Sequence, residues 1–238
     1  MKPITVVSAT RRTPAEFEAD APLCASLRKL TIAGATIAPK IVYQNSLGLG
    51  TVYNRYLTTE YHDHILVFVH DDVRIEDLFF ADKLNDAVRY FDVVGLAGNQ
   101  KPDLGYPSWF DQRRPLSGFV AHPHQAPSPE APTGTVAISA YGPSPAPCLL
   151  LDGLFLAVNA DSVLSRGVRF DEQFAFHFYD LDFCRLSAAQ GLRLGTWPLW
   201  VIHQSGGAFN TPAWKQAARA YQKKWAGELA PADAGSPR

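Results

Sequence analysis

The chain of 238 residues has little cysteine and no excess of either charge. Its three cysteines, Cys24, Cys148 and Cys184, are an odd number at wide spacing, which fits neither a disulfide framework nor a Cys-x-x-Cys metal site. We therefore expect buried thiols in a reducing compartment. Lysine and arginine number 22 against 23 acidic residues, so a net charge of −1 gives no general attraction for polyanions, and no nucleic-acid partner is expected.

Long apolar runs are also missing. The longest candidate, residues 148–158, is interrupted by Asp152 and Gly153 and is shorter than the ~18 apolar residues of a membrane span. Residues 1–7 lack the apolar length and the cleavage site of a signal peptide. With 47% hydrophobic and 19% charged residues, the composition is that of an ordinary globular protein. The sequence predicts a folded, cytoplasmic protein.

The order of apolar runs predicts an α/β fold. Strands are expected at residues 4–8, 41–43, 65–69 and 93–96, with helical patterns over 14–30, 51–61 and 75–91 between them. Residues 65–69 are continuously apolar, which requires cover on both faces of a sheet. The alternation of strands and helices indicates a parallel or mixed sheet in one α/β domain.

The last third of the chain continues this alternation. The pattern predicts a strand over 149–158 interrupted at Asp152-Gly153, a short helix over 163–166, a helix over 182–190 ending at Gly191, one strand over 192–202, and a last helix from Thr211-Pro212 to about residue 229.

Residues 101–147 differ in character because they hold ten of the 18 prolines. We expect irregular or hairpin structure there. A segment of this length inside a compact domain is often a lid or a binding loop, and Trp109, Phe110, Arg113 and Arg114 are its candidate ligand contacts. The alternative is a loop packed by its own aromatic residues. No role is assigned to the histidines of this segment.

The strongest cluster of polar residues is His70-Asp71-Asp72, directly after the apolar strand. Ligands of open α/β sheets bind outside the carboxyl ends of strands. Two carboxylates and an imidazole at such a place are suited to a divalent ion such as Mg²⁺ or Mn²⁺, which in turn neutralises a diphosphate. On spacing alone, a solvated turn that caps the next helix is the more common outcome.

Two further segments are candidates for chemistry. Asp180 and Asp182 precede a helix and follow an aromatic run, where either acid is suited to be a helix cap. In a cleft among those aromatics, Asp180 would gain basicity and accept a proton from a hydroxyl. His203 follows a strand and precedes two glycines. It is either structural or a further ligand beside Asp72.

In order, these motifs resemble the GT-A glycosyltransferases, specifically the large inverting family two. The resemblance covers most of the chain. It is carried by Gly48 with Asn54, by residues 70–73 as a DxD strand, by residues 151–158 as the "DG" strand, by residues 169–174 as the "FDExF" turn, by residues 179–185 with Gly191 as the "EDxDxxxR…G" helix, and by the late His203.

The resemblance implies a single GT-A domain with a mixed central sheet flanked by helices. Residues 1–100 would be the nucleotide-sugar half, residues 101–147 an insertion, and residues 148–230 the acceptor and catalytic half. It implies Asp180 as catalytic base, metal ligation by Asp72, His203 and His70, donor binding by Ser8, Asn54, Asp71, Asp152 and Gly153, and acceptor binding by Trp109, Tyr179 and Asp182. The implied cofactor is Mn²⁺ or Mg²⁺.

The implied activity is transfer of a sugar from a nucleotide diphosphate sugar to an acceptor hydroxyl with inversion, in surface glycan synthesis. His70 replaces the first acid of the DxD motif and Tyr179 replaces the glutamate of the ED pair. A histidine-x-aspartate version of the motif occurs in a short glycosyltransferase-like subgroup that this chain also resembles. Both replacements leave open a degenerate GT-A domain that binds nucleotide or glycan without turnover. A sugar nucleotidyltransferase is a second alternative, for which Arg11-Arg12 is the only candidate phosphate loop.

The last helix mixes basic and aromatic residues, among them Trp214, Lys215, Tyr221, Lys224 and Trp225. Interfacial helices have this composition. If the acceptor is lipid-linked, residues 212–229 would make peripheral contact with the inner membrane face. The alternative is a capping helix with an ordinary solvated face.

Overall fold

The computed structural model describes residues 1–123, 135–207 and 209–226, and it confirms an α/β fold with two mixed sheets flanked by helices. The first sheet has the order β2-β1-β3-β11-β5-β12-β9. These strands are β1 (Ile4–Ala9), β2 (Ile37–Val42), β3 (Ile65–Val69), β5 (Val93–Gly95), β9 (Ala146–Pro147), β11 (Phe155–Asn159) and β12 (Leu194–Thr196). β1 is parallel to both β2 and β3, whereas β11 is antiparallel to β3 and β5.

The second sheet has the order β10-β6-β7-β13-β4, and β8 pairs with β7 outside this path. Its strands are β4 (Val73–Ile75), β6 (Ala97–Asn99), β7 (Leu116–Pro123), β8 (Val136–Gly142), β10 (Leu150–Leu151) and β13 (Val201–His203). β13 is parallel to β7, with Ile202 opposite Ala121, and antiparallel to β4. β13 therefore places His203 beside the start of β4, with His203 opposite Val73.

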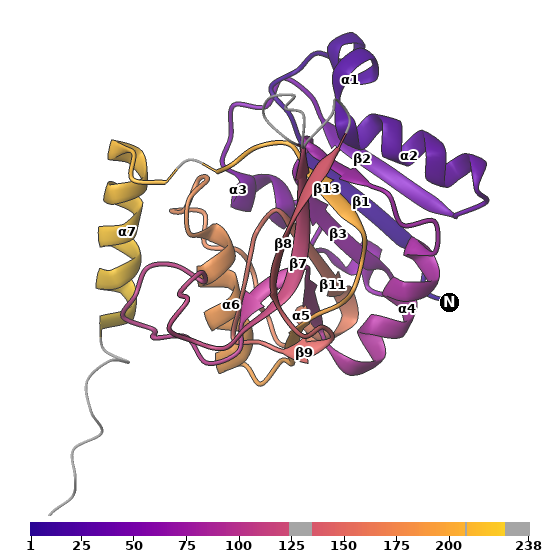
Figure 1. The fold of residues 1–238 in the computed structure, drawn as a ribbon. Helices are drawn as coiled ribbons and strands as arrows, with labels where there is room; N and C mark the ends of the chain where they lie inside the picture. The colour runs from indigo at the N-terminus through magenta and orange to yellow at the C-terminus, as the bar shows by residue number, and fades with distance from the viewer. Residues whose placement is uncertain (124–134, 208, 227–238) are drawn as a thin grey trace, which may run out of the picture.

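Helices lie on either side of the strands in Figure 1, with α2 and α4 on the right and α6 and α7 on the left. The helices are α1 (Pro14–Asp20), α2 (Pro22–Ile32), α3 (Leu49–Asn54), α4 (Phe80–Tyr90), α5 (Ala160–Ser165), α6 (Tyr179–Ala189) and α7 (Pro212–Trp225), with a 3-10 turn at Thr59–Tyr61. Within the described residues, no helix combines the length and the apolar character needed to cross a membrane.

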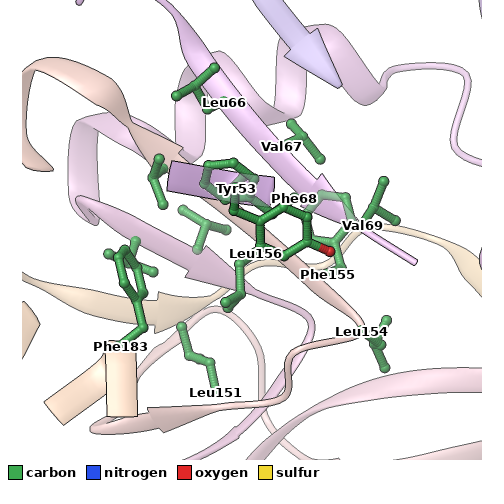
Figure 2. Packing of buried hydrophobic residues seen from close by; sticks show 14 of the residues in the cluster. Tyr53, Leu66, Val67, Phe68, Val69, Leu151, Leu154, Phe155, Leu156 and Phe183 are labelled. Atoms are coloured by element: carbon green, nitrogen blue, oxygen red, sulfur yellow. The ribbon is translucent and has the colours of Figure 1, made fainter. Parts of the chain in front are cut away.

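The core lies around the pairing of β3 with β11. Every residue of β3 is buried, as its continuous apolar sequence predicts. Figure 2 shows Phe68 of this strand beside Tyr53 and Phe155, and the Tyr53 and Phe68 rings are 4.7 Å apart. Tight packing fixes the end of β3, and it therefore also fixes where the backbone of the polar residues 70–72 begins.

Several expected elements are divided in the structure. The helix expected over 14–30 is two helices, because Ala21 is extended (ψ 124°) before Pro22, as the residue before a proline prefers. The pattern over 51–61 is α3 followed by the 3-10 turn. The helix expected over 75–91 begins only at Phe80, because β4 continues to Ile75 and pairs with β13.

The single strand expected over 192–202 is also wrong. It consists of β12 and β13, which lie in different sheets with Pro198 between them. Proline cannot donate to a strand ladder, so the chain leaves one sheet there and enters the other. The proline-rich segment contains the antiparallel pair β7 and β8. Its residues 124–134 lie outside the described part of the chain. Strand 65–69, the helix end at Gly191 (φ 74°) and the Thr211 cap are confirmed.

Candidate active site

A cavity of about 690 Å³ lies where the ends of β3 and β13 meet the start of α6. It is within the size range of small-molecule sites. Its lining includes His70, Asp71, Asp72, Trp109, His122, Tyr141, Asp152, Gly153, Phe176, Tyr179, Asp180, His203, Ser205, Phe209 and Trp214. Segments that are far apart in the sequence therefore contribute to one concave surface, and most of the residues predicted to carry chemistry are among them.

His70, Asp72 and His203 form a cluster on one side of this cavity. One ligand atom of each lies within 4.8 Å of the others. His203 Nε2 is 3.4 Å from Asp72 Oδ1 and 3.1 Å from Ser205 Oγ. Asp72 Oδ1 is buried and is the carboxylate oxygen of this ion pair. A buried carboxylate oxygen beside two imidazoles fits a divalent cation, and this observation supports the three predicted ligands.

Burial and neighbouring groups shift the pKa values of two members of this cluster, Asp72 and His70. Burial raises the pKa of Asp72, but hydrogen bonding and charge from His203, together with Ser205 and His70, outweigh it and bring the pKa to about 2. Burial lowers the pKa of His70 more strongly than Asp72 and its neighbours raise it. At neutral pH the site therefore presents an ionised carboxylate and a neutral imidazole, the forms that bind a metal.

Gly153 is hydrogen-bonded to two residues at the start of α6, Tyr179 and Asp180. Its amide donates to Asp180 Oδ2 at 2.8 Å, and its carbonyl accepts from the Tyr179 hydroxyl at 2.7 Å. A Cβ at this position would lie 2.6 Å from the Tyr179 hydroxyl and 2.7 Å from Asp180 Cβ. Only glycine admits this approach, which explains the residue that interrupts the apolar run at 152–153.

Asp180 occupies the first turn of α6, next to Asp152. Burial raises the pKa of Asp180 to about 7, and the charge of Asp152 adds to the effect against backbone hydrogen bonds that oppose it. Helix α6 starts after Phe178, which has φ 67°, an uncommon conformation for a residue other than glycine. A carboxyl group with this pKa in a cavity is suited to accept a proton near neutral pH.

Three of the predicted site residues do not line the cavity. Ser8 is fully buried within β1 and its hydroxyl has no hydrogen-bond partner among the described residues. Asn54 holds the turn at Phe170: its Nδ2 donates to the Phe170 carbonyl at 2.9 Å and its Oδ1 accepts from the Phe170 amide at 3.0 Å. Asn54 Nδ2 also contacts Glu172 Oε1 at 3.1 Å. This geometry gives Asn54 a structural role.

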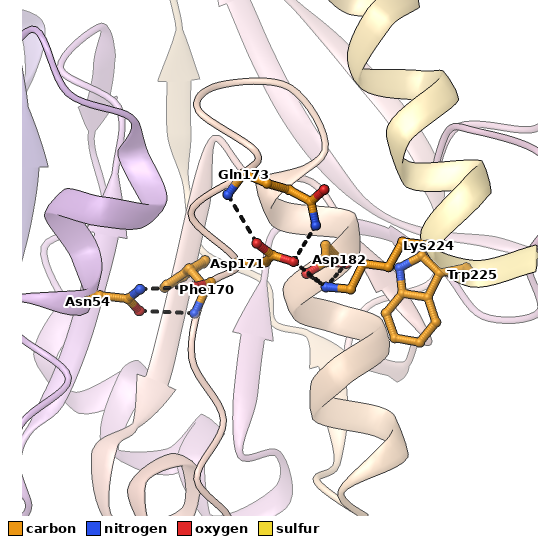
Figure 3. Close-up of polar contacts among 7 residues, drawn as sticks. All are labelled: Asn54, Phe170, Asp171, Gln173, Asp182, Lys224 and Trp225. Carbon is orange, nitrogen blue, oxygen red and sulfur yellow. Dashed lines mark hydrogen bonds and ion pairs between the residues drawn. The ribbon is translucent and has the colours of Figure 1, made fainter.

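Asp182 is the third of these residues. It is 0% exposed and binds Lys224 at 2.8 Å and the Trp225 indole nitrogen at 2.9 Å. Lys224 also reaches Asp171 Oδ2 at 2.7 Å. Figure 3 shows this network joining α7 to α6 and to the turn that Asn54 holds. Asp182 therefore anchors the last helix.

The same network bears on the predicted membrane contact of the last helix. Tyr221 and Trp225 are buried, and the Arg185 guanidinium lies 4.2 Å from the Trp225 ring centroid. Part of the aromatic side of α7 is thus packed inside the protein. Residues 227–229 of the predicted contact lie outside the described part of the chain, and the contact itself stays a prediction.

Asp71 and Trp109 both line the cavity with partners of their own. Asp71 Oδ2 accepts from Thr10 Oγ1 at 2.6 Å and lies 3.7 Å from Arg12 Nε. Arg12, part of the only candidate phosphate loop, thus has a carboxylate partner. Trp109 packs edge-on against Tyr141, with 5.0 Å between the ring centroids. The proline-rich segment 101–147 is thus packed by its own aromatic residues and also lines the cavity. A self-packed loop and a ligand-binding loop are therefore compatible descriptions of it.

His122 and Ser205 are cavity residues that sequence reasoning missed. His122 Nδ1 donates to the His203 carbonyl at 3.2 Å, from the neighbouring strand β7. The two histidines are separated by 81 positions. The pairing of β7 with β13 brings them together, and no local pattern indicates that pairing. For Ser205, its position two residues after a candidate ligand was the available signal.

Among the solved structures that match this chain, two are described here, and both are distant in sequence. No family model matches it, and no curated protein matches it. A197 from STIV is 14% identical, with a TM-score of 0.49 over 85% of this chain and 86% of that chain. The catalytic domain of Drosophila beta1,4galactosyltransferase 7 in complex with xylobiose is 13% identical, with a TM-score of 0.44 over 92% of this chain and 80% of that chain.

Proposed function

We propose that this chain is an inverting GT-A glycosyltransferase that moves a sugar from a nucleotide diphosphate sugar to an acceptor hydroxyl. One observation carries the proposal: the candidate metal ligands His70, Asp72 and His203 converge to within 4.8 Å in the cavity that also contains Asp180. The order of motifs along the sequence supports the same family. The division into a donor half over 1–100 and a catalytic half over 148–230 belongs to this proposal.

The donor diphosphate is assigned to the His70, Asp72 and His203 end of the cavity. A bound Mn²⁺ or Mg²⁺ would supply neutralisation of the charge that develops on the leaving diphosphate. Asp71 and the Asp152-Gly153 turn lie in the same wall and are proposed donor contacts. The hydrogen bond from Thr10 fixes the Asp71 carboxylate in this wall of the cavity.

Asp180 is the proposed catalytic base. Its carboxyl group, with a pKa raised to about 7 by burial and by Asp152, accepts the proton of the acceptor hydroxyl as that oxygen attacks the anomeric carbon. The hydrogen bond from the Gly153 amide fixes the position of Asp180 Oδ2 in the cavity. Attack on the face opposite the leaving diphosphate inverts the configuration.

The acceptor is assigned to the aromatic wall of the cavity, which includes Trp109, Phe176 and Phe209. A glycan or a lipid-linked acceptor presents faces that stack on such rings. For a lipid-linked acceptor, contact of residues 212–229 with the inner membrane face would place the cytoplasmic enzyme beside its substrate. Lys215, Arg219 and Lys223 are exposed on α7, so anionic vesicles at low salt are the test of that contact.

The activity test incubates the purified chain with a panel of nucleotide diphosphate sugars, acceptor sugars and Mn²⁺ or Mg²⁺, and measures released nucleoside diphosphate. We expect release with one donor class, lost in Asp180→Asn and in Asp72→Asn. The control is Asp20→Asn, an exposed acid at the end of α1. Release of pyrophosphate would indicate a nucleotidyltransferase. Metal-dependent nucleotide binding without any release would indicate a degenerate binding domain.

A further inference from the structure

Two cavity residues that depart from the family pattern are in direct contact. His70 Nε2 lies 3.0 Å from the Tyr179 hydroxyl, although the residues are 109 positions apart. His70 follows β3 and Tyr179 begins α6. His70 stands in place of an acid and Tyr179 in place of a glutamate. Because the two side chains are hydrogen-bonded to each other, we look for one explanation of both replacements.

The direction of this hydrogen bond follows from the second contact of Tyr179. The Tyr179 hydroxyl donates to the Gly153 carbonyl at 2.7 Å. A hydroxyl has a single proton to donate. If that proton pointed at His70, two acceptor oxygens would face each other at 2.7 Å in a buried place, at a large cost. Tyr179 therefore accepts from His70, which must carry its proton on Nε2.

The consequence concerns the other nitrogen of the His70 ring. A neutral imidazole has one N–H and one lone pair, so a proton on Nε2 leaves the lone pair on Nδ1. Histidines that bind metals commonly donate their second N–H to an acceptor in the protein, and that bond fixes both the tautomer and the ring orientation. In this chain the acceptor is a phenol hydroxyl that is itself fixed on a backbone carbonyl.

We infer that Tyr179 is a positioning residue that holds His70 as the Nε2–H tautomer and so presents His70 Nδ1, with Asp72 and His203, to a divalent transition-metal ion. The inference rests on the metal site of the proposed function and explains how this chain builds that site without the first acid of the motif. Asp72 Oδ1, which is buried and lies 3.4 Å from His203 Nε2, is the carboxylate member of the set.

The donor set also selects a class of ion. Two imidazole nitrogens and one carboxylate favour later first-row divalent metals over Mg²⁺, which prefers oxygen ligands. We therefore expect Co²⁺ and Mn²⁺ to bind more tightly than Mg²⁺, with Co²⁺ ahead of Mn²⁺. Replacing His70 by aspartate exchanges one nitrogen ligand for oxygen. In His70→Asp, the difference in affinity between Mn²⁺ or Co²⁺ and Mg²⁺ should therefore be smaller than in the unmodified chain.

The tautomer is tested first, on metal-free protein labelled with ¹⁵N in its histidines. Imidazole ¹⁵N shifts distinguish the two neutral tautomers, and the His70 signals are identified as those lost in His70→Asp. We expect the Nε2–H form in the unmodified chain and a loss of that preference in Tyr179→Phe. A His70 ring in the Nδ1–H form in the unmodified chain would overturn the inference, with no variant needed.

Metal affinity is tested second, by the electron paramagnetic resonance signal of free Mn²⁺, without donor or acceptor. Tyr179→Phe should weaken Mn²⁺ binding by about 10- to 100-fold, as the loss of an outer-shell partner does. In the His70→Asp background the same change should have less than about a twofold effect, because the imidazole it orients is gone. Tyr90→Phe is the control, since Tyr90 is exposed and stacks on Trp197 away from the cavity.

Equal Mn²⁺ affinity of Tyr179→Phe and the unmodified chain would overturn the inference, and so would an equal loss in both backgrounds. Thermal unfolding of each metal-free variant shows whether a lost affinity reflects a lost fold. Because neither measurement contains a sugar nucleotide, a chain that binds metal as described but transfers no sugar would retain this inference and disprove the proposed function.

Discussion

The backbone amide of Gly153 donates to Asp180 Oδ2 at 2.8 Å, and a Cβ at residue 153 would lie 2.7 Å from Asp180 Cβ. The turn between β10 and β11 is therefore interlocked with the start of α6. This contact connects the candidate base to the core, because β11 pairs with β3 along its length. The position of Asp180 relative to His70 depends on it.

Gly153→Ala is expected to damage both stability and activity. The added methyl group must displace Tyr179 or Asp180, and such overpacking typically costs about 1–3 kcal/mol. We expect a lower denaturant midpoint and at least tenfold less nucleoside diphosphate release. Gly206→Ala is the stability control, because a Cβ there meets nothing within 4 Å. Equal stability of Gly153→Ala and the unmodified chain would contradict the described packing.

The pH dependence of transfer should follow Asp180. The base works only when deprotonated, so kcat/KM should rise with pH through about 7, the raised pKa of Asp180. Burial is the larger cause of that pKa and Asp152 the second. Asp152→Asn should therefore move the acid limb of the pH profile to lower pH while leaving it above the ordinary carboxyl range. If the acid limb of the Asp152→Asn profile stayed at the same pH, a group other than Asp180 would control the rate.

Asp180→Asn should be inactive yet more stable at high pH. Loss of a general base typically costs about 10²- to 10⁴-fold in rate. The raised pKa means that between its ordinary value of 3.8 and about 7 the folded state keeps a proton that the unfolded state releases, so stability falls as pH rises through this window.

Asparagine is neutral and loses no stability as the pH rises. We expect Asp180→Asn to increase the free energy of unfolding by on the order of 1–3 kcal/mol at pH 8 and to change it little at pH 4. Denaturant unfolding of both proteins at the two pH values measures the difference. Asp20→Asn, at an exposed acid, should show no such dependence on pH. Lower stability of Asp180→Asn at pH 8 would contradict the raised pKa.

Asn54→Ala should lower stability without weakening metal binding. It leaves the buried amide and carbonyl of Phe170 without their partner, at about 2–4 kcal/mol for two unsatisfied groups. Asn45→Ala is the control, because the Asn45 side chain hydrogen-bonds across its own exposed turn to the backbone of Leu47. Unfolding midpoints and Mn²⁺ titration give the two readouts. A loss of affinity at unchanged stability would restore Asn54 to the site.

The sequence predicts the chemistry of this site better than its geometry. His70 and Asp72 follow a strand whose apolar run needs no tertiary information, and that strand is found at the expected residues. Asn54 and Asp182 belong to recognisable motifs, but whether an amide or a carboxylate faces a cavity or a neighbouring helix depends on packing. Lys224, which pairs with Asp182, is 42 positions away in a helix whose docking no local pattern indicates.

His122 is a cavity residue that the local sequence does not indicate. It lies in a segment of high proline content, and its relation to His203 arises only from the pairing of β7 with β13. The division of residues 192–202 between two sheets was missed for a related reason. Pro198 indicates a break, but which sheet each half joins is decided by strands far along the chain.

Calorimetric titration with a panel of nucleoside diphosphates, with and without Mn²⁺, measures whether the cavity binds the donor diphosphate through a metal. We expect that one nucleoside diphosphate binds, that Mn²⁺ strengthens its binding at least tenfold, and that Asp72→Ala removes the effect of the metal while Asp20→Ala does not. Failure of every nucleoside diphosphate to bind in the presence of Mn²⁺, with the chain folded, would contradict this expectation.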